Sequence, residues 1–223
     1  MCGRFVQLPL KFPERLPWPE LAGELQEMNP RYNLAPTQRA AVVLDEAGKA
    51  VVRKLRWGLL PRWIKDTKQS YSMINARIET VATKPAYRAA FKSRRCLIPM
   101  AGYYEWRDTP DGKQPYFIAH RDGIDLFAAG LWEPRHRLQR ETEEGSCTVI
   151  TRDARDEAGT VHDRMPVFLE PDAADRFMRA GPDEAMEILM ASPTPPLEVR
   201  AVSRRVNGVK EDEPSLLDVI DRT

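Results

Sequence analysis

Cys2 is the second residue of the chain, so removal of Met1 would place a thiol and a free α-amine on the same residue. An α-amine titrates near roughly 7.7–8.0 and a thiol near roughly 8.5, so both keep a reactive fraction at neutral pH. Such an aminothiol can attack an acyl group with its own amine as the base. It can also condense with an aldehyde to an imine that the thiol closes into a five-membered thiazolidine. A small residue at position 2 also simply permits methionine removal, so Cys2 alone leaves these interpretations open.

Glu105 is a candidate general acid or base because it stands among aromatic residues, in the segment 103–106. Burial beside aromatic rings disfavours the carboxylate and raises its pKa towards neutrality, where proton transfer is efficient. In an extended strand Tyr103 and Glu105 face one side and Trp106 faces the other, so we assign chemistry to Glu105 and packing to Trp106. The alternative is an exposed glutamate on an edge strand.

Two further segments carry polar side chains that an active site could use. Asn75 and Arg77 are two residues apart, so in an extended segment they point to the same side. His162 lies between apolar and charged neighbours. It is the natural second acid or base, although a lone histidine is more often structural than catalytic.

Aromatic and basic residues together indicate a surface for nucleic acid. Trp57 and Trp63 lie in a stretch with glycine and proline, flanked by arginine and lysine, and indole rings stack on bases. The alternative is that both indoles anchor this loop to the core. A basic helix expected over 85–93 would add a local positive field for phosphates. Because the net charge is only +1, nucleic-acid binding would depend on such a local patch.

The elements that must position these residues follow from periodicity and turn residues. A helix is expected around 13–25, where leucines recur at helical spacing, and two more are expected to begin at Pro171 and Pro182. Apolar runs predict several strands, and Asp111 followed by Gly112 predicts a hairpin turn between two of them.

Composition limits the class of protein. The chain has 223 residues, 42% of them hydrophobic and 30% charged, which is typical of one large globular domain or two small ones. It lacks an apolar run near the roughly 20 residues of a membrane span and lacks a signal-peptide pattern, so we expect a soluble, cytoplasmic protein with no membrane partner. Its three cysteines and three histidines are scattered. We therefore expect reduced thiols, with Cys96 and Cys147 in the core, no metal and no cofactor.

Seven short segments, taken in order, resemble the SOS response-associated peptidase (SRAP) family, and together they cover nearly the whole chain. They are Cys-Gly-Arg-Phe at 2–5, Arg-Tyr-Asn at 31–33, Trp-Gly at 57–58, Asn-Ala-Arg at 75–77, the run 94–106, Ala-Gly-Leu-Trp-Glu at 129–133 and His-Asp-Arg-Met-Pro at 162–166. The resemblance implies an α+β fold with a strongly curved, barrel-like core of mixed or antiparallel strands flanked by helices. We expect one domain over 1–223, with 210–223 as a solvated tail.

The resemblance also implies a function. It predicts a protein, expected to be a monomer, that binds single-stranded DNA and links covalently to abasic sites through a thiazolidine between Cys2 and the ring-opened sugar aldehyde. The protein would be associated with the nucleoid when bound to DNA. β-Elimination and autoprocessing or peptidase activity would be associated activities.

The implied site residues fall into two groups. In the catalytic group, Cys2 is the nucleophile, Asn75 positions its amine, Glu105 is the acid/base and His162 assists imine formation and strand release. In the DNA-binding group, arginines hold phosphates and a tryptophan stacks near the lesion; its members are Arg4, Trp63, Arg77 and Arg164.

The sequence is also compatible with two other functions. The first is an N-terminal-nucleophile amidohydrolase or peptidase, in which Cys2 attacks an amide and its amine acts as the base. The second is a non-catalytic module for single-stranded DNA in which Cys2 is incidental. An abasic oligonucleotide should give a one-to-one covalent product only with the crosslinking protein.

Overall fold

Two β-sheets form most of the structure, a computed structural model that describes residues 2–220. The larger sheet contains β3 (Arg39–Glu46), β4 (Lys49–Trp57), β5 (Asn75–Arg77), β6 (Arg95–Met100), β9 (Leu126–Pro134), β10 (Gly145–Asp153) and β11 (Arg164–Pro166). The smaller sheet contains β1 (Arg4–Gln7), β2 (Arg31–Leu34), β7 (Gly102–Thr109), β8 (Gly112–His120) and β12 (Leu197–Ala201).

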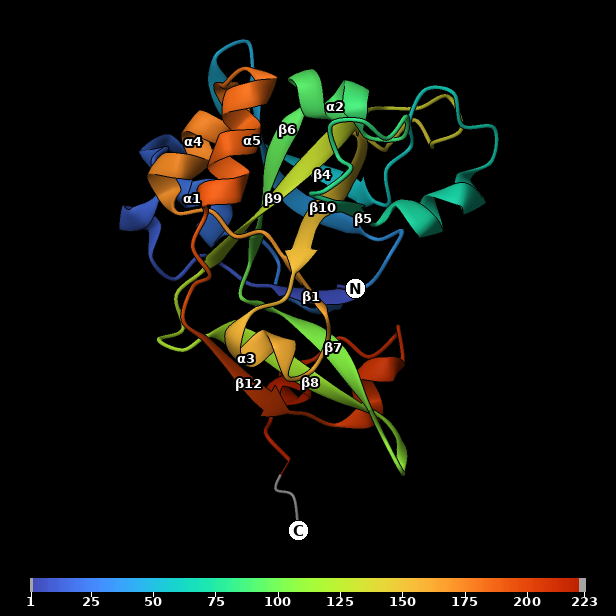
Figure 1. The fold of residues 1–223 in the computed structure, drawn as a ribbon, viewed down its shortest axis with the longest axis vertical. Helices are drawn as coiled ribbons and strands as arrows, with labels where there is room; N and C mark the ends of the chain where they lie inside the picture. Colours follow the sequence, from blue (N-terminus) through green and yellow to red (C-terminus); the bar gives the residue numbers. More distant parts are fainter. Residues whose placement is uncertain (1, 221–223) are drawn as a thin grey trace.

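The helices are short and lie around the sheets. The α-helices are α1 (Ala22–Gln26), α2 (Arg88–Ser93), α3 (Asp156–Gly159), α4 (Pro171–Arg179) and α5 (Pro182–Ala191). Short 3-10 helices occur at Pro13–Arg15, Pro19–Leu21, Thr67–Met73, Arg204–Asn207 and Pro214–Leu217. Figure 1 shows α1, α2, α4 and α5 gathered at one end of the molecule, and β7, β8, β12 and α3 at the other.

The strands of the larger sheet form a ring, because β10 pairs with β4, β4 with β3, β3 with β6, β6 with β9, and β9 again with β10. Both β4 and β5 run parallel to β10, whereas the other pairings in this sheet are antiparallel. This arrangement confirms the expected α+β single domain with a strongly curved core of mixed strands.

The ring strands are buried on both faces, which explains why they read as continuous apolar runs rather than as alternating patterns. In β3, for example, Val43 joins a hydrophobic cluster with α1, α2, α4 and α5. Its neighbours Val42 and Leu44 point to the opposite face, into a second cluster shared with the smaller sheet. That second cluster contains Cys2 and Phe5, so the start of the chain belongs to the core between the sheets.

The structure corrects the expected helix over 13–25. That stretch forms two 3-10 turns, Pro13–Arg15 and Pro19–Leu21, before the five-residue α1. The prolines at 13, 17 and 19 lack an N–H for the helical ladder and clash with the preceding turn, so a continuous helix cannot form. The helices that begin at Pro171 and Pro182 are confirmed.

The end of the chain is docked on the protein rather than free over its described part, 210–220. Asp212 accepts hydrogen bonds from the backbone N–H groups of Tyr32 and Asn33, and Leu216 is fully buried. These contacts cover the open edge of β2 and correct the expectation of a solvated tail for this segment. Residues 221–223 lie outside the described part of the chain.

Gly102, at the start of β7, allows the close approach of β8. A Cβ atom at this position would lie 2.5 Å from Phe117 Cζ and 2.6 Å from the backbone oxygen of Ile118. We therefore expect Gly102→Ala to lower the free energy of unfolding by about 1–3 kcal/mol through overpacking. Urea denaturation followed by circular dichroism measures this change.

A matched control for Gly102→Ala is Gly23→Ala. Gly23 lies in α1 with open space around its Cβ position, so alanine there should raise stability by roughly 0.5–1 kcal/mol. Equal stability of the two variants would contradict the packing argument.

Within residues 2–220 the structure contains no helix that is both long and apolar enough to cross a membrane.

Candidate active site

Cys2 lies two residues before the start of β1, which is placed between β7 and β2 in the smaller sheet. Its side chain is fully buried, and its Sγ donates a weak hydrogen bond to the backbone oxygen of Arg4 at 3.8 Å. Burial raises the pKa of the Cys2 thiol well above its usual range, and the nearby charge of Glu105 adds to the rise. The thiol is therefore protonated at neutral pH, and it needs a base to become a nucleophile.

Asn75 holds the backbone of Cys2. Its Nδ2 donates a hydrogen bond to the carbonyl oxygen of Cys2 at 2.8 Å, and its Oδ1 is buried without a partner. The position of Asn75 is in turn set by β5, which runs parallel to β10, and by Tyr87, whose hydroxyl donates to the Asn75 carbonyl at 3.0 Å. Asn75 thus fixes the main chain that carries the thiol.

Glu105 lies beside Cys2 because β1 and β7 are paired. The register sets Arg4 opposite Tyr104 and Phe5 opposite Tyr103, which places Glu105 next to the start of β1. The side chain of Glu105 is 2% exposed, and burial raises its pKa to about 7. A carboxylate with this pKa can both accept and return a proton near neutrality.

His162 shares an open cleft with Glu105. The cleft has a volume of about 420 Å³, and Trp106, Lys113 and Asn207 also line it. Burial lowers the pKa of His162, so the ring is neutral at pH 7. Its Nδ1 accepts the backbone N–H of Arg164 at 3.0 Å and lies 2.7 Å from Asp163 Oδ1. The cleft is an opening by which a substrate can approach Glu105 and His162.

Two of the four predicted DNA contacts face solvent. Arg77 is exposed on β5, and the indole of Trp63 is 55% exposed. Trp57, by contrast, is fully buried and donates from its indole Nε1 to the Ile74 carbonyl at 2.9 Å. For Trp57 the alternative interpretation, an anchor of the loop, is therefore correct.

The other two predicted DNA contacts are held by the protein itself. Arg4 donates from Nη1 to the Val206 carbonyl at 2.7 Å. Arg164 is 6% exposed, pairs with Glu79 at 2.7 Å and with Asp153 at 2.5 Å, and donates to the Thr151 carbonyl. These contacts tie both guanidinium groups to the fold around the site, through Nη1 in Arg4 and through Nη1 and Nη2 in Arg164. Their contact with phosphate stays a prediction.

Sequence reasoning missed two tyrosines at the site. Tyr87 supports Asn75, and no local signal points to it, since the pair is made by the tertiary structure. Tyr103 is fully buried in the same cluster as Cys2. Strand alternation places Tyr103 on the same face as Glu105, and this pattern is a sequence signal that Tyr103 lies at the site.

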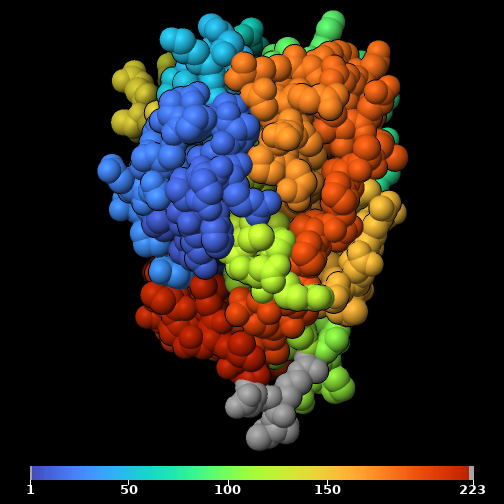
Figure 2. Space-filling view, turned by 90° about the vertical axis from the view of Figure 1, so that its left-hand side faces the viewer, coloured from blue at the N-terminus to red at the C-terminus, as the bar shows by residue number. Residues whose placement is uncertain are grey.

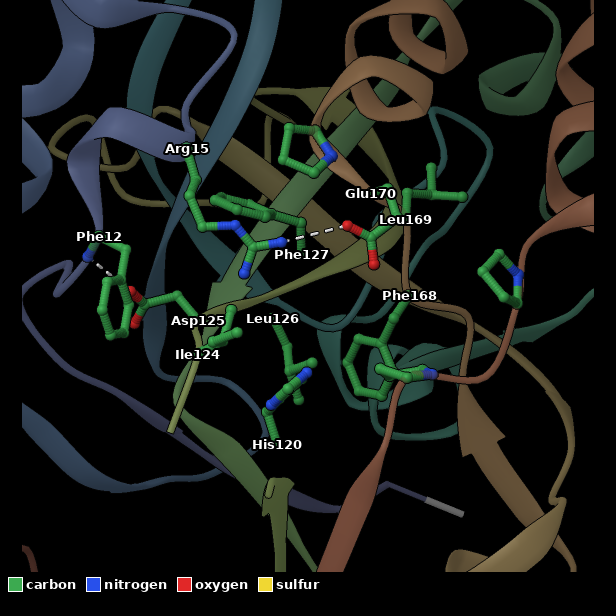
Figure 3. A pocket seen from close by; sticks show the side chains of 13 residues that line it. Phe12, Arg15, His120, Ile124, Asp125, Leu126, Phe127, Phe168, Leu169 and Glu170 are labelled. Carbon is green, nitrogen blue, oxygen red and sulfur yellow. Dashed lines mark hydrogen bonds and ion pairs between the residues drawn. The ribbon is translucent and has the colours of Figure 1, made fainter. Parts of the chain in front are cut away.

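A more enclosed pocket lies elsewhere, where the N-terminal segment meets β9 and the segment after α5. Figure 2 shows that these parts, coloured blue, yellow-green and orange-red, share one face of the molecule. Figure 3 shows two contacts between its polar groups: Asp125 accepts the backbone N–H of Phe12, and Arg15 contacts Glu170 at 3.2 Å. Cys2 and Glu105 do not line it, so this pocket is separate from the site around the thiol.

The described part of the chain holds no group of three or more histidine, cysteine, aspartate or glutamate side chains arranged for a metal ion. The site is thus defined by a buried thiol, an amide that fixes its backbone, and a carboxyl group that titrates near neutrality.

Comparison with known proteins identifies the class of protein to which this fold and site belong. The sequence profile of the SOS response associated peptidase (SRAP) family matches residues 1–209. The chain therefore belongs to the SRAP family, as its seven segments indicated.

Individual relatives agree with this assignment. The chain is 36% identical over 229 residues to the abasic site processing protein YoqW of Bacillus subtilis (strain 168), covering 98% of this chain and 99% of that protein. It is 29% identical over 235 residues to the abasic site processing protein YedK of Escherichia coli (strain K12), covering 99% and 100%. The crystal structure of a phage-related protein from Bordetella bronchiseptica matches with a TM-score of 0.72 and 28% identity, covering 91% of this chain and 95% of that one.

Proposed function

We propose that this protein processes abasic sites by binding single-stranded DNA and forming a thiazolidine between Cys2 and the ring-opened sugar aldehyde. The observation that carries the proposal is the meeting of three groups: the buried Cys2 thiol, Asn75 on its carbonyl, and Glu105 with a pKa of about 7. The names of the relatives, abasic site processing proteins, support the choice of substrate.

The first step is imine formation. After removal of Met1, the α-amine of Cys2 attacks the aldehyde carbon C1′, and the carbinolamine loses water to give a C=N bond. Asn75 holds the Cys2 carbonyl at 2.8 Å and so limits the rotation of the residue that carries the amine. The neutral imidazole of His162, on the cleft shared with Glu105, is suited to move protons in the dehydration.

The second step is ring closure. The thiol proton passes to the Glu105 carboxylate, the sulfur electron pair forms the bond to C1′, and the π electrons of C=N move to nitrogen, which takes a proton from Glu105. Aldehyde and aminothiol thus become thiazolidine and one water. The attack is intramolecular, where effective concentrations reach about 10⁵ M or more.

A side reaction follows from the same intermediate. An imine at C1′ acidifies the hydrogens at C2′, so a base can remove one of them while the 3′ phosphate leaves. Glu105 and His162 are the bases on the cleft. We therefore propose β-elimination as an associated activity, in competition with ring closure.

The experiment that tests the function is intact mass spectrometry after mixing the processed protein with abasic single-stranded DNA. The expected product is one oligonucleotide per protein, linked with loss of one water. Turnover of an amide substrate without an adduct would instead favour the amidohydrolase. Reversible, salt-sensitive binding alone would favour a simple DNA-binding module.

Arg77→Ala tests the DNA surface. Arg77 is exposed on β5, two residues from Asn75, so we propose that it contacts a phosphate near the lesion. Its removal should weaken binding to any single strand and lower the salt slope of the affinity by about 0.7, the value for one lost phosphate contact. Fluorescence anisotropy across a salt series measures the slope.

Arg176→Ala is the matched control for Arg77→Ala. Arg176 is an exposed arginine on α4, paired with Glu184, and its loss should leave the slope unchanged. A slope that also stays unchanged in Arg77→Ala would make Arg77 a structural residue.

A further inference from the structure

Tyr103 carries a buried hydroxyl group for which the fold supplies no hydrogen-bond partner. The residue is fully buried, and its phenol oxygen is unpaired. Phenylalanine would fill the same space without an orphaned polar atom, and unpaired buried hydroxyls destabilise a folded protein. Such a group therefore indicates a partner that arises during function.

Tyr103 lies on the face of β7 that carries the reacting residues. Tyr103 and Glu105 lie on the same face of β7, and Tyr103 shares its hydrophobic cluster with Cys2. Its neighbour Tyr104 points to the opposite side, where its hydroxyl donates to the Tyr32 carbonyl at 2.9 Å. The ring of Tyr103 packs against Phe168, with 6.0 Å between the ring centres, so the phenol is held in place.

The chemical state of the phenol makes it a hydrogen-bond donor. Burial raises the pKa of Tyr103 well above its usual range, and the charges of Cys2 and Glu105 raise it further. Both groups are therefore within electrostatic reach of the phenol. The phenol therefore keeps its proton near neutral pH, and it does not compete with Glu105 for the thiol proton.

Ring closure creates the need for such a donor. In the resting protein the Cys2 sulfur is itself the donor, to the Arg4 carbonyl. When the thiol gives up its proton, the sulfur becomes a buried anion that must accept hydrogen bonds, because burial without a donor is costly for a charge. Tyr103, which shares a hydrophobic cluster with Cys2, offers a buried O–H group that is unpaired.

We propose that the Tyr103 hydroxyl donates a hydrogen bond to the Cys2 sulfur as it becomes a thiolate, which makes Tyr103 a further catalytic residue for ring closure. This inference rests on the proposed thiazolidine chemistry. The phenol proton stays on Tyr103 throughout, while the thiol proton goes to Glu105 and the sulfur electron pair goes to C1′. The charge on sulfur disappears as the S–C bond forms, so the hydrogen bond acts mainly between thiol and product.

The test separates the two chemical steps in Tyr103→Phe, which keeps the ring and its packing. Borohydride trapping of the imine measures the first step, and formation of the heat-stable adduct measures the second. We expect imine formation at the wild-type rate and ring closure slowed by about tenfold or more, the effect of one hydrogen bond to a charged group.

Two further variants test whether the effect is specific to the hydroxyl group of Tyr103. Tyr104→Phe loses a hydroxyl on the other face of β7 and should close the ring at the wild-type rate. A fluorinated tyrosine at position 103 keeps nearly the same volume and strengthens the donor, so closure should be at least as fast as in the wild type. A purely structural phenol would not respond to its acidity in this way.

The outcomes are distinct. If the wild-type protein forms no heat-stable adduct, the proposed function and this inference fail together. If the wild type forms the adduct and Tyr103→Phe closes the ring equally fast, only the inference fails. Equal slowing of imine formation and closure in Tyr103→Phe would also overturn it, because the phenol would then act on the site as a whole.

Discussion

Addition of a few residues before Met1 is expected to abolish the heat-stable adduct with abasic DNA while single-strand binding remains measurable. In the extended protein the nitrogen of Cys2 is an amide without a free lone pair, so it cannot form an imine with the aldehyde. The thiol alone gives at most a thiohemiacetal, which reverses on denaturation. Denaturing gel electrophoresis after mixing with abasic single-stranded DNA measures the adduct, and anisotropy measures the binding.

Three controls distinguish the amine from the thiol. A protease cut that exposes Cys2 as the first residue should restore the adduct. Cys2→Ala should lose the stable adduct and keep nearly all single-strand affinity, because we expect binding to depend on surface groups such as Arg77. Cys2→Ser should keep the amine and give an imine that borohydride traps, with little stable ring. An extended protein that crosslinks as well as the processed one would show that an ordinary thiol nucleophile is at work.

Glu105→Gln should slow ring closure by roughly 10²-fold or more and leave DNA binding nearly unchanged, because the variant lacks the base for the thiol proton. The change is nearly isosteric in a site where the side chain is 2% exposed, so the fold should persist. The rate of heat-stable adduct formation after rapid mixing measures the effect. Glu24→Gln, an exposed glutamate on α1, is the control and should react at the wild-type rate.

The pH dependence of closure gives the same test a second readout. Burial raises the pKa of Glu105 to about 7, so the fraction of carboxylate, the form that takes the thiol proton, increases as the pH rises through this value. The wild-type rate should therefore rise up to about pH 7 and then level off, and Glu105→Gln should lack this inflection. A wild-type rate that is constant from about pH 5 to 9 would remove Glu105 from the mechanism.

Local features of the sequence determined the elements and several of the site residues. Proline at the first turn sets the start of α4 and α5, and Gly112, with φ of 96°, closes the hairpin between β7 and β8. Strand alternation sets Glu105 and Tyr103 on one face. These predictions succeed because each depends on the backbone and side chain of a few neighbouring residues.

The meeting of the site residues was decided by the tertiary structure. Asn75 reaches the carbonyl of Cys2 across 73 positions of the chain. The parallel pairing of β5 with β10 and the antiparallel pairing of β1 with β7 bring the two residues together. Periodicity reports which face a residue occupies, and it carries no information on which strand lies opposite or in which register. The sequence therefore predicted which types of residue form the site. Only the resemblance to a family indicated that these residues lie together.

The burial of the site residues and the hydrogen-bond and ion-pair partners of the arginines were also decided by the tertiary structure alone. The sequence does not show that Arg4 donates to the Val206 carbonyl or that Arg164 pairs with Glu79 and Asp153. The pKa of Glu105 likewise depends on how completely β1, β7 and the ring exclude water from it. Both are properties of the assembled core, because solvation and charge pairing depend on atoms that only the folded chain brings together.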